Sequence, residues 1–527
     1  MWAHQWRDRV WARLGQHWDL VVVGGGITGA GVLRLAAQLG LRALLLEARD
    51  FGWGTSSRST KLVHGGLRYL AQGQFHVTRQ SVRERERLAA EGPGLVDWMG
   101  FLFPIYQGTS PGQRSLALGL AFYDLFARKW AHAYHQAESF ALLAPHIRRG
   151  RLRGGFLYED AVTDDARLVL RVLREAVRAG AAALNYAEVR SLLFDRAGHV
   201  NGVAVRDIAT GRQADVRARA VVNATGAWSD TLRAQVGGEP RMRPSRGSHL
   251  IFPSWRLPLA QSCTLVHPGD GRPVFVLPWE GVAVAGTTDL DHGQPLGEEP
   301  HITTMEVDYL MSALQAGFPT LNLKTQDAIA SFSGVRPILG SGTGDPSKES
   351  RAHAVMQEKG LVTVAGGKLT TFHAMAQDTV QAVRGLLPEI RPVTREVRAL
   401  DAVPADLLDG EVFDREQRRR LLGRYGVDAP NLVAAARPGE LHAIEATSFL
   451  WAELRWAARD EGVMHLDDLL LRRVRVGLLL PQGAMALLDR IRTIAQPELG
   501  WDDLRWEAET AAYAETWQRG YSLPVAH

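Results

Sequence analysis

A glycine-rich turn close to the start of the chain limits the folds that this sequence can adopt. Gly24, Gly26 and Gly29 form G-x-G-x-x-G directly after the β-branched run Asp19 to Val23 and before a helical pattern that reaches about Leu39. The first glycine permits a tight turn, the second lets a pyrophosphate approach the helix N-terminus, and the third lets helix and strand pack closely. This context predicts a strand, turn and helix that bind a nucleotide at the turn.

An acidic residue and a second turn support the same interpretation. Glu47 closes the next apolar run, Leu41 to Leu46, where its carboxylate can accept hydrogen bonds from a ribose diol. Together with the glycines it favours an FAD or NAD site over glycines that serve only the packing of helix and strand. Farther along, the A-T-G-A-W segment that includes Gly226 and Trp228 is either a second approach to the same nucleotide or an ordinary strand end.

Composition excludes several other classes of protein. The 61 Lys and Arg residues exceed the 57 Asp and Glu residues by only four, too small an excess for a dedicated nucleic-acid binder. The single cysteine, Cys263, excludes an intrachain disulfide and a Cys-based zinc or iron–sulfur site, and we expect no metal. No apolar run is long enough to cross a bilayer, and Met1 to Trp18 lacks the apolar segment of a secretory signal, so the sequence predicts a cytoplasmic protein.

The order of helical and strand patterns predicts an α/β fold with an additional β-rich part. A helix is expected over Asp165 to Arg178, and β candidates separated by Pro and Gly clusters stand at 203–205, 220–223, 275–277, 282–285 and 361–364. After about Arg391 the pattern changes, and from His442 onward it is helical with almost no strand signal. A domain boundary is therefore expected near residue 400. The Gly-, Ser- and Pro-rich stretch 340–350 is expected to be an exposed connection.

Six blocks of sequence narrow the interpretation further. They are the Gly24 turn, Gly54 to Leu70, Arg246 to His249, Gly286 to Asp289, Ser333 to Pro337 and Gly366 to Phe372. In this order they closely resemble the FAD-dependent glycerol-3-phosphate dehydrogenases of the aerobic, quinone-linked type. The resemblance extends from about residue 18 to the C-terminus, although the helical segment 453–477 contributes less specifically.

The resemblance implies a mixed α/β (α+β) architecture in two regions. Residues 1–400 are expected to form the oxidoreductase region and residues 401–527 a helical C-terminal domain. Within the first region, an FAD-binding Rossmann-like domain of the GR2 or D-amino-acid-oxidase type is expected at about 17–75, 150–245 and 350–400. A β-sheet substrate domain is expected to take 76–149 and 246–349.

The resemblance also implies the chemistry. Non-covalently bound FAD would accept a hydride at N5 from C2 of sn-glycerol 3-phosphate, dihydroxyacetone phosphate would be released, and a quinone would take the electrons. The expected setting is the inner face of the cell membrane, to which the protein would attach peripherally, and a homodimer is left open. Two alternatives remain: a soluble oxidase of the same fold that uses oxygen with another hydroxy or amine donor, and a flavin-binding subunit without turnover.

Lysine is rare in this chain, which makes two of its lysines informative. Only six of the 61 basic residues are lysine, and Lys61 and Lys368 stand in hydroxyl-rich or glycine-rich blocks. A compact point charge is expected at these positions instead of the planar fork of arginine. Gly366 and Gly367, before a helix that begins near Lys368, would direct free N–H groups and the lysine at the negative charge of a reduced flavin, with a plain helix cap as the alternative.

Site residues follow from matching this sequence to the family's blocks. His249 is the candidate general base, with a structural histidine as the alternative. Arg336, which stays protonated, is expected to polarise the substrate and, with Arg351, to hold its phosphate. The expected substrate-binding residues are Arg68, Tyr69, Arg351, Lys368 and Thr370. The expected cofactor-binding residues are Gly24, Gly26, Gly29, Glu47, Thr55, Ser56, Ser57, Ser59, Thr60, Lys61, His64, Gly226, Trp228, Gly334, Gly366, Gly367, Lys368, Leu369 and Thr370. For the hydroxyls at 55–60, a solvated loop is the alternative.

Two positions depart from the family's pattern. The family usually has T-T-Y-R after the glycine–lysine turn, whereas this chain has Thr371, Phe372 and His373. The change removes a permanent charge from a helix expected near the substrate, which would weaken phosphate binding or change the choice of substrate. Arg246 stands where the family has a lysine, and the general arginine bias of the chain explains that exchange.

Two apolar and basic segments are candidates for membrane contact. Trp2, Trp6, Val10 and Leu14 recur every four residues near several arginines, a pattern typical of a helix that lies in a membrane interface. Packing against the protein body is an equally good explanation. The segment Leu470 to Gly477 leaves the same two alternatives.

Overall fold

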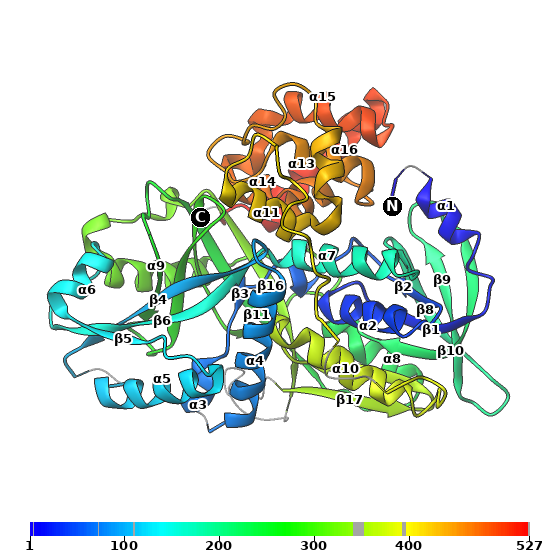
Figure 1. Ribbon diagram of the computed structural model, residues 1–527, viewed down its shortest axis with the longest axis horizontal. Helices are drawn as coiled ribbons and strands as arrows, with labels where there is room; N and C mark the ends of the chain where they lie inside the picture. The colour runs from blue at the N-terminus through cyan, green and yellow to red at the C-terminus, as the bar shows by residue number, and fades with distance from the viewer. Residues whose placement is uncertain (4, 72, 109–110, 341–351, 393–396, 525–527) are drawn as a thin grey trace.

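The computed structural model describes all of the chain except residues 4, 72, 109–110, 341–351, 393–396 and 525–527, and the side chains of Arg68 and Ala71. The connection expected at 340–350 therefore lies almost wholly outside the described residues. Two β-sheets lie side by side, and the C-terminal helices, orange and red in Figure 1, are seated above the line where the two sheets meet. The mixed α/β fold class predicted from the sequence is confirmed.

The first sheet contains the predicted nucleotide-binding unit. Its strand order is β17-β18-β10-β1-β2-β7, and β8 and β9 extend β10. The strands are β1 (Trp18–Val23), β2 (Ala43–Leu46), β7 (Ala182–Leu184), β8 (Ala187–Phe194), β9 (Val200–Asp207), β10 (Gln213–Asn223), β17 (His353–Glu358) and β18 (Leu361–Gly366). Four helices accompany it: α2 (Ile27–Gln38), α7 (Asp165–Arg178), α8 (Ser229–Gln235) and α10 (Phe372–Val383). The neighbours from β18 to β7 run parallel, as crossover helices require.

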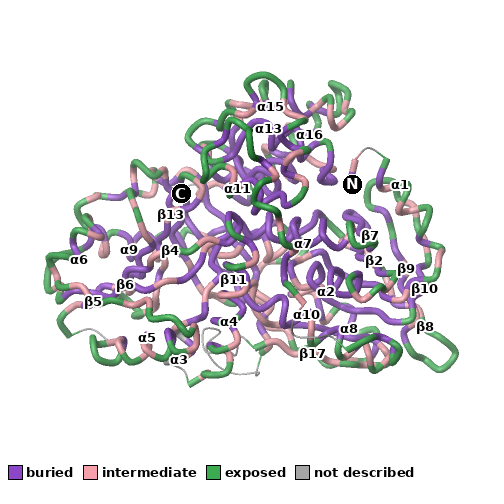
Figure 2. The backbone as a smooth tube through the Cα atoms, viewed as in Figure 1, coloured by how far each residue is buried: buried purple, intermediate pink, exposed green. Residues whose placement is uncertain are grey.

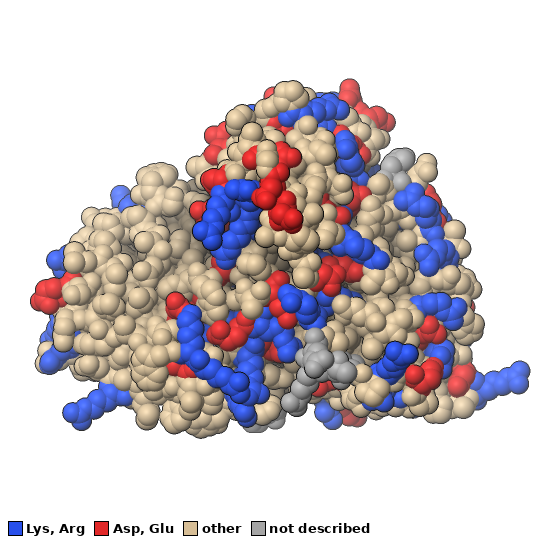
Figure 3. Space-filling view, viewed as in Figure 1, with Lys and Arg blue, Asp and Glu red and all other residues tan. Residues whose placement is uncertain are grey.

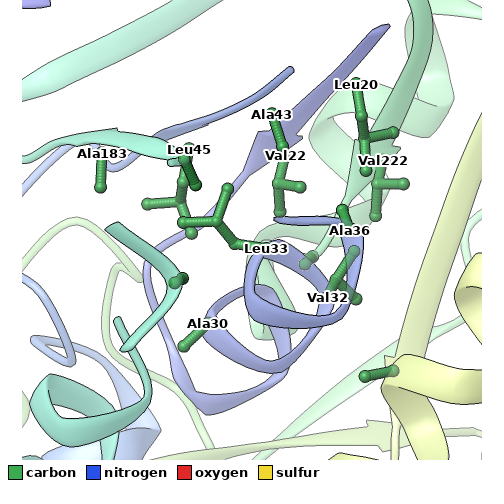
Figure 4. Packing of buried hydrophobic residues seen from close by; sticks show 14 of the residues in the cluster. Leu20, Val22, Ala30, Val32, Leu33, Ala36, Ala43, Leu45, Ala183 and Val222 are labelled. Carbon is green, nitrogen blue, oxygen red and sulfur yellow. The ribbon is translucent and has the colours of Figure 1, made fainter. Parts of the chain in front are cut away.

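Apolar side chains of β1 and α2 form the centre of this region. Figure 4 shows Leu20 and Val22 of β1 beside Val222 of β10, with Leu33 and Ala36 of α2 packed beneath them. All five are fully buried. Complete burial of a Val or Leu side chain contributes about 1.5–3 kcal/mol, so this packing fixes the position of the turn that joins β1 to α2.

The register of the parallel strands brings their carboxyl ends to one edge of the sheet. Val23 pairs with Asn223 on one side and with Leu46 on the other, and Asn223 pairs in turn with Thr363. The glycine turn, Glu47, the A-T-G segment and the Gly366 turn each follow one of these strands, so all four meet at this edge. Ligands of open parallel sheets bind in the crevice outside the carboxyl ends of the strands.

Two glycines of the first turn are required by close packing. Gly24 has a φ of 110°, which residues with a side chain rarely adopt, and a Cβ at Gly29 would overlap the carbonyl oxygen of Gly24. Gly29 therefore serves helix packing and does not face the crevice. This is the role expected of the third glycine.

The second sheet has the order β15-β11-β14-β13-β12-β4-β6-β3, with β16 paired to β11 and β5 to β6. Its strands are β3 (Leu62–Val63), β4 (Val96–Tyr106), β5 (Ala133–Gln136), β6 (Leu152–Thr163), β11 (Met242–Pro253), β12 (Ser262–Val266), β13 (Pro273–Trp279), β14 (Val282–Gly286), β15 (Leu290–Asp291) and β16 (Ala330–Leu339). Its helices are α3 (Leu67–Ala71), α4 (Phe75–Glu91), α5 (Gln113–Ala127), α6 (Ala137–Leu143) and α9 (Thr304–Gly317). The segment from 150 was expected in the FAD-binding domain, but β6 pairs along its length with β4 and lies in this second sheet.

The C-terminal part of the chain is helical, as its sequence pattern predicts. It contains α11 (Arg415–Tyr425), α12 (Ala429–Ala435), α13 (Trp451–Asp460), a π-helix (Asp468–Arg473), α14 (Val476–Leu479), α15 (Leu488–Leu499) and α16 (Asp503–Gly520). Figure 2 shows that the segments of these helices that face the two sheets are buried.

Both segments considered for membrane contact pack against the protein body. Trp2, Trp6 and Leu14 are buried around the short helix α1 (Trp6–Trp11), and Trp2 stacks on Phe51 at 5.0 Å between ring centres. The segment Leu470 to Gly477 is buried throughout. Of the two alternatives considered from the sequence, packing against the protein body is therefore the one that both segments show. Within the described ranges, no helix combines the length and hydropathy needed to cross a bilayer.

Candidate active site

A cavity of about 530 Å³ lies between the carboxyl edge of the first sheet and the second sheet. Most of the residues expected at the cofactor and substrate line it. They are Gly24, Gly26, Glu47, Thr55, Ser56, Ser59, Thr60, His64, Tyr69, Gly226, Trp228, His249, Gly334, Arg336, Gly366, Gly367, Lys368, Leu369 and Thr370. The chain thus brings residues from widely separated blocks together around one cavity.

The nucleotide end of the cavity is built by backbone and hydroxyl groups. The Ser56 hydroxyl accepts a hydrogen bond from the Ile27 N–H at 3.0 Å, which places it at the N-terminus of α2. The Glu47 carboxylate accepts from the backbone N–H of Gly25 at 2.6 Å and of Arg49 at 2.8 Å. These bonds hold the carboxylate at the end of β2, where a ribose hydroxyl can reach its remaining acceptor positions.

The residues present fit FAD. A Cβ at Gly26 would approach the Ser56 hydroxyl to 3.1 Å and fill the space over the N-terminus of α2, where a pyrophosphate would sit. The cavity extends from Glu47 and Val189 at the end of the first sheet to Phe275 on β13. All of the following residues line the cavity; bound FAD would be held by Gly24, Gly26, Thr55 and Ser56 at the pyrophosphate, by Glu47 at the ribose, and by Thr60, His64 and Gly366 to Leu369 at the flavin.

His249 lies on β11 at the floor of the cavity. Its Nε2 is 2.9 Å from the Thr60 hydroxyl, and its ring stacks on Phe332 of β16 at 4.4 Å. A Cβ at Gly286 of β14, the paired residue, would overlap the imidazole ring, so the glycine makes room for it. Burial, reinforced by the charges of Arg336 and Lys61, holds the pKa of His249 well below its usual value. The ring is therefore neutral near pH 7, the form that can accept a proton.

Arg336 lies across the same floor from β16. Its guanidinium donates to the Thr287 hydroxyl at 2.7 Å and to the Asp289 carboxylate at 3.1 Å. A Cβ at Gly247 of β11 would overlap the guanidinium, so a glycine is needed beneath it. Asp289 also accepts from the Ser245 hydroxyl at 2.6 Å. The fork is therefore held in one orientation at the cavity wall.

A third group of predicted residues meets beside α3 and α10. The Lys368 ammonium donates to the Ser81 hydroxyl at 2.6 Å and lies 4.4 Å from the centre of the Tyr69 ring. The Thr370 hydroxyl accepts from the His64 N–H at 3.2 Å. The structure thus joins the Gly54 to Leu70 block to the Gly366 to Phe372 block.

Three residues expected at the cofactor do not line the cavity. Gly29 packs against the first turn, and Ser57 is buried. Lys61 has no exposed surface, and its ammonium binds the Asp165 carboxylate and the Ser57 carbonyl at 2.8–2.9 Å. Asp165 is a fully buried carboxylate at the start of α7 and needs a cation, which Lys61 supplies. Arg351 and the side chain of Arg68 lie outside the described residues.

The two departures from the family's pattern lie away from the cavity. His373 is buried on α10, and its ring contacts the Gln377 amide at 3.1 Å. Desolvation, followed by the charges of Arg87 and Arg34, lowers the pKa of His373 to about 4. His373 does not line the cavity, so its neutral ring neither adds a charge to the cavity wall nor contacts the substrate space. Arg246 forms a buried ion pair with Glu306 at 2.8 Å.

Sequence reasoning did not single out Arg272, which also lines the cavity. It stands just before β13, and its Nε donates to the Asp270 carboxylate at 2.8 Å while one Nη lies 3.3 Å from the Asp289 carbonyl. Asp289 thereby links two arginines, Arg272 and Arg336. Nothing in the sequence distinguishes Arg272 from the other arginines, apart from the Gly-Asp-Gly turn that precedes it.

Comparison with known proteins gives a consistent result. Residues 19–418 match the family model described as FAD dependent oxidoreductase, and residues 363–506 match the C-terminal domain of alpha-glycerophosphate oxidase. The chain is 36% identical to glycerol-3-phosphate dehydrogenase 2 of Mycobacterium bovis, across 96% of this chain and 89% of that protein. It is 34% identical to the aerobic glycerol-3-phosphate dehydrogenase of Staphylococcus aureus, across 86% of both. A glycerol-3-phosphate dehydrogenase from Bacillus halodurans, solved with FAD, superposes with a TM-score of 0.79 at 28% identity, covering 99% of this chain and 98% of that one.

Proposed function

The chain belongs to the FAD-dependent glycerol-3-phosphate dehydrogenases, and on that premise we propose that it oxidises sn-glycerol 3-phosphate at C2 and releases dihydroxyacetone phosphate. The observation that carries the proposal is one cavity that joins a dinucleotide cradle to a neutral histidine and a fixed arginine. When bound, FAD supplies at its N5 atom the acceptor for the hydride that leaves C2.

His249 supplies the base in this proposal. Its Nε2 faces the Thr60 hydroxyl at the cavity wall, so a C2 hydroxyl placed there lies within reach of the same nitrogen. Because the ring is neutral, it can take the hydroxyl proton as the C2–H bond breaks. The stack on Phe332 and the close fit over Gly286 hold the ring, so orientation is established before the substrate arrives.

The phosphate is held by fixed cations. Arginine presents paired N–H donors that match phosphate oxygens, and Arg336 and Arg272 both stand at the cavity wall with Asp289 between them. Lys368 adds a point charge from the turn after β18. Arg68, Tyr69, Arg351 and Thr370 complete the proposed substrate-binding set.

Anaerobic mixing with substrate tests the proposal. The purified FAD-loaded protein should lose its flavin absorbance when sn-glycerol 3-phosphate is added without oxygen, and glycerol, which lacks the phosphate, should leave the absorbance unchanged. Phosphate recognition by fixed cations predicts this difference. Failure of FAD to bind, or reduction by amino-acid donors but not by sn-glycerol 3-phosphate, contradicts the proposal.

A quinone is the proposed electron acceptor, and an anionic membrane surface the proposed site of attachment. Phe75 of α4 and Leu118, Phe122 and Leu125 of α5 are exposed, and Phe75 packs edge-on against Phe122 at 6.1 Å. We call these four residues the α5 surface. Exposed basic residues lie on the same two helices or directly after α5, namely Arg79, Arg83, Arg114, Arg128 and Lys129. Figure 3 shows basic side chains gathered over α4 on the lower part of this face. Apolar groups bordered by cations suit a bilayer of anionic lipids.

The α5 surface also lies close to the cavity. Helix α5 packs against α3, whose Leu67 and Tyr69 line the cavity wall. A membrane seated on this surface would bring a membrane-dissolved acceptor near the flavin end. Reduction of a quinone, with little peroxide formed in air, is expected of this arrangement. Rapid peroxide formation without quinone reduction would instead favour the oxidase alternative.

The double substitution Leu118→Glu/Phe122→Glu should abolish binding to vesicles of phosphatidylglycerol and phosphatidylcholine, because it places two carboxylates at the apolar centre of the α5 surface. Flotation of the FAD-loaded protein measures the bound fraction. Trp255→Glu, an exposed apolar residue outside the α5 surface, is the matched control and should float as the wild type does. Equal flotation of the double variant and the wild type would exclude this surface.

A further inference from the structure

Lys61 is a buried cation that the proposed reaction does not use. Its ammonium is held by Asp165 and by the Ser57 carbonyl and does not reach the cavity. It does, however, lie 4.6 Å from the centre of the Phe332 ring. Phe332 in turn stacks on His249 with 9° between the ring planes. One chain of contacts thus leads from the buried lysine to the base.

A second connection runs through the backbone. Thr60, the residue before Lys61, is the partner of His249 Nε2 at 2.9 Å. The Lys61 backbone has a φ of 65°, in the left-handed region, and its N–H donates to the Ser59 hydroxyl at 3.1 Å. Ser59 itself is bound to Asp165 through its hydroxyl at 2.8 Å. The ion pair therefore anchors the short segment that presents the Thr60 hydroxyl to the imidazole.

We propose that Lys61 is a positioning residue for His249: through Phe332 and Thr60 it fixes the imidazole at the cavity wall, and its charge favours the neutral ring. The proposal rests on the function proposed for His249. It assigns a role to Lys61, which stands in the hydroxyl-rich block but does not line the cofactor cavity. Burial, followed by the charge of Arg475, lowers the pKa of Lys61 to about 7, so its ammonium is protonated over the acid range in which His249 takes up a proton. A cation close to an imidazole disfavours a second positive charge there.

The other charged groups around His249 are arranged in pairs. On the segments packed against it they are Arg336 with Asp289, Arg246 with Glu306, Arg243 with Asp291, Arg272 with Asp270, Arg58 with Glu299, and Arg475 with Asp164 and Asp165. Asp165 has two cationic partners, Lys61 at 2.9 Å and Arg475 at 3.3 Å. Removing the Lys61 charge therefore leaves Asp165 paired with Arg475, and the buried carboxylate keeps a counter-ion.

The test combines three variants of the FAD-loaded protein. Lys61→Met removes the charge and keeps most of the stem, Lys61→Arg keeps the charge, and Phe332→Leu removes the stacking ring. Lys359→Met, at an exposed lysine, is the matched control. For each protein, the rate constant for anaerobic flavin reduction at low substrate concentration is measured as a function of pH. Because the substrate is the same throughout, its own ionisation affects every profile equally.

The acid limb of this profile, where His249 becomes protonated, should move to higher pH by about one unit in Lys61→Met, the size of shift that one nearby charge produces. It should stay at the wild-type position in Lys61→Arg and Lys359→Met. Phe332→Leu should lower the plateau rate without moving the limb. An unmoved limb in Lys61→Met, or an equal shift in Lys61→Arg, overturns the proposal.

A second readout does not depend on turnover. The Cε1–H resonance of His249, assigned by its loss in His249→Gln, should titrate at higher pH in Lys61→Met than in the wild type. If Lys61→Met does not fold, a wild-type plateau rate in Phe332→Leu overturns the inference. If sn-glycerol 3-phosphate does not reduce the wild-type flavin, it is the proposed function that fails, whereas the resonance still decides whether Lys61 controls the ring.

Discussion

Replacing His249 by glutamine should slow anaerobic flavin reduction by sn-glycerol 3-phosphate about 10²- to 10⁴-fold, the usual contribution of a positioned general base. Glutamine can keep a hydrogen bond to Thr60 but cannot accept the C2 hydroxyl proton. Stopped-flow absorbance of the FAD-loaded protein measures the rate. Because Arg336 and Arg272 are untouched, the substrate concentration that half-saturates the rate should change much less than the maximum rate.

His267→Gln is the matched control for this result. His267 is also a buried histidine, stacked on Tyr309 at 3.7 Å, but it does not line the cavity. Its replacement should leave the reduction rate close to that of the wild type. Similar losses in the two variants, or a full rate in His249→Gln, would show that His249 is not the base.

The pH profile of the wild-type enzyme also tests whether His249 is the general base. His249 is active when neutral, so the rate should fall only where falling pH protonates the ring. Burial together with Arg336 and Lys61 holds the pKa of His249 well below its usual value. The enzyme's acid limb should therefore lie well below the pH at which an exposed histidine titrates.

Local patterns made much of the nucleotide end predictable. The positions of Gly24, Gly26 and Glu47 depend on one strand, one turn and one helix, and short-range rules describe such units well. The meeting of these residues with Gly226 and Gly366 follows from parallel strands that end at one edge. Only the family's pattern, and not any single segment, placed His249 and Arg336 near that edge.

The residues that sequence reasoning misplaced depend on contacts between distant segments. Lys61 turns away to a carboxylate far along the chain, on α7, which no local pattern around Lys61 reveals. His373 is buried by α10 packing, although its position in the block suggested the substrate side. Arg272 lines the cavity and contacts the Asp289 carbonyl in the loop after β14, a contact between segments that lie apart in the sequence. In a chain so rich in arginine, the burial of each arginine and its ion-pair partners in the folded protein determine which of them line the active site.

Ion pairs between residues far apart in the sequence also join the C-terminal helices to the first sheet. Asp50, just after β2, is fully buried and accepts hydrogen bonds from Arg472 at 2.5 Å and from Arg473 at 2.7 Å. Arg472 also binds Asp467 and Asp468, whereas the only carboxylate partner of Arg473 among the described residues is Asp50. A segment that looked suited to a membrane surface therefore forms an internal ionic contact between two regions of the protein.

Asp50→Asn should lower the free energy of unfolding by about 3–5 kcal/mol, because it leaves the buried Arg473 guanidinium without a counter-ion. Urea unfolding of the FAD-loaded protein, followed by tryptophan fluorescence, measures the change as an earlier first transition. Asp409→Asn, at the exposed pair with Arg418, is the matched control and should leave the transition where it is.

The pH dependence of this difference separates loss of charge from loss of packing. The arginine charges overcome the desolvation of Asp50 and lower its pKa from 3.8 to about 2. A carboxyl with a lowered pKa stabilises the fold above its unfolded-state pKa and loses that contribution as pH falls toward the folded-state value. The gap between wild type and Asp50→Asn should therefore narrow as the pH falls below about 4. A gap that stays constant into the acid range would mean that Asp50 acts through its shape and hydrogen bonds, and not through its charge.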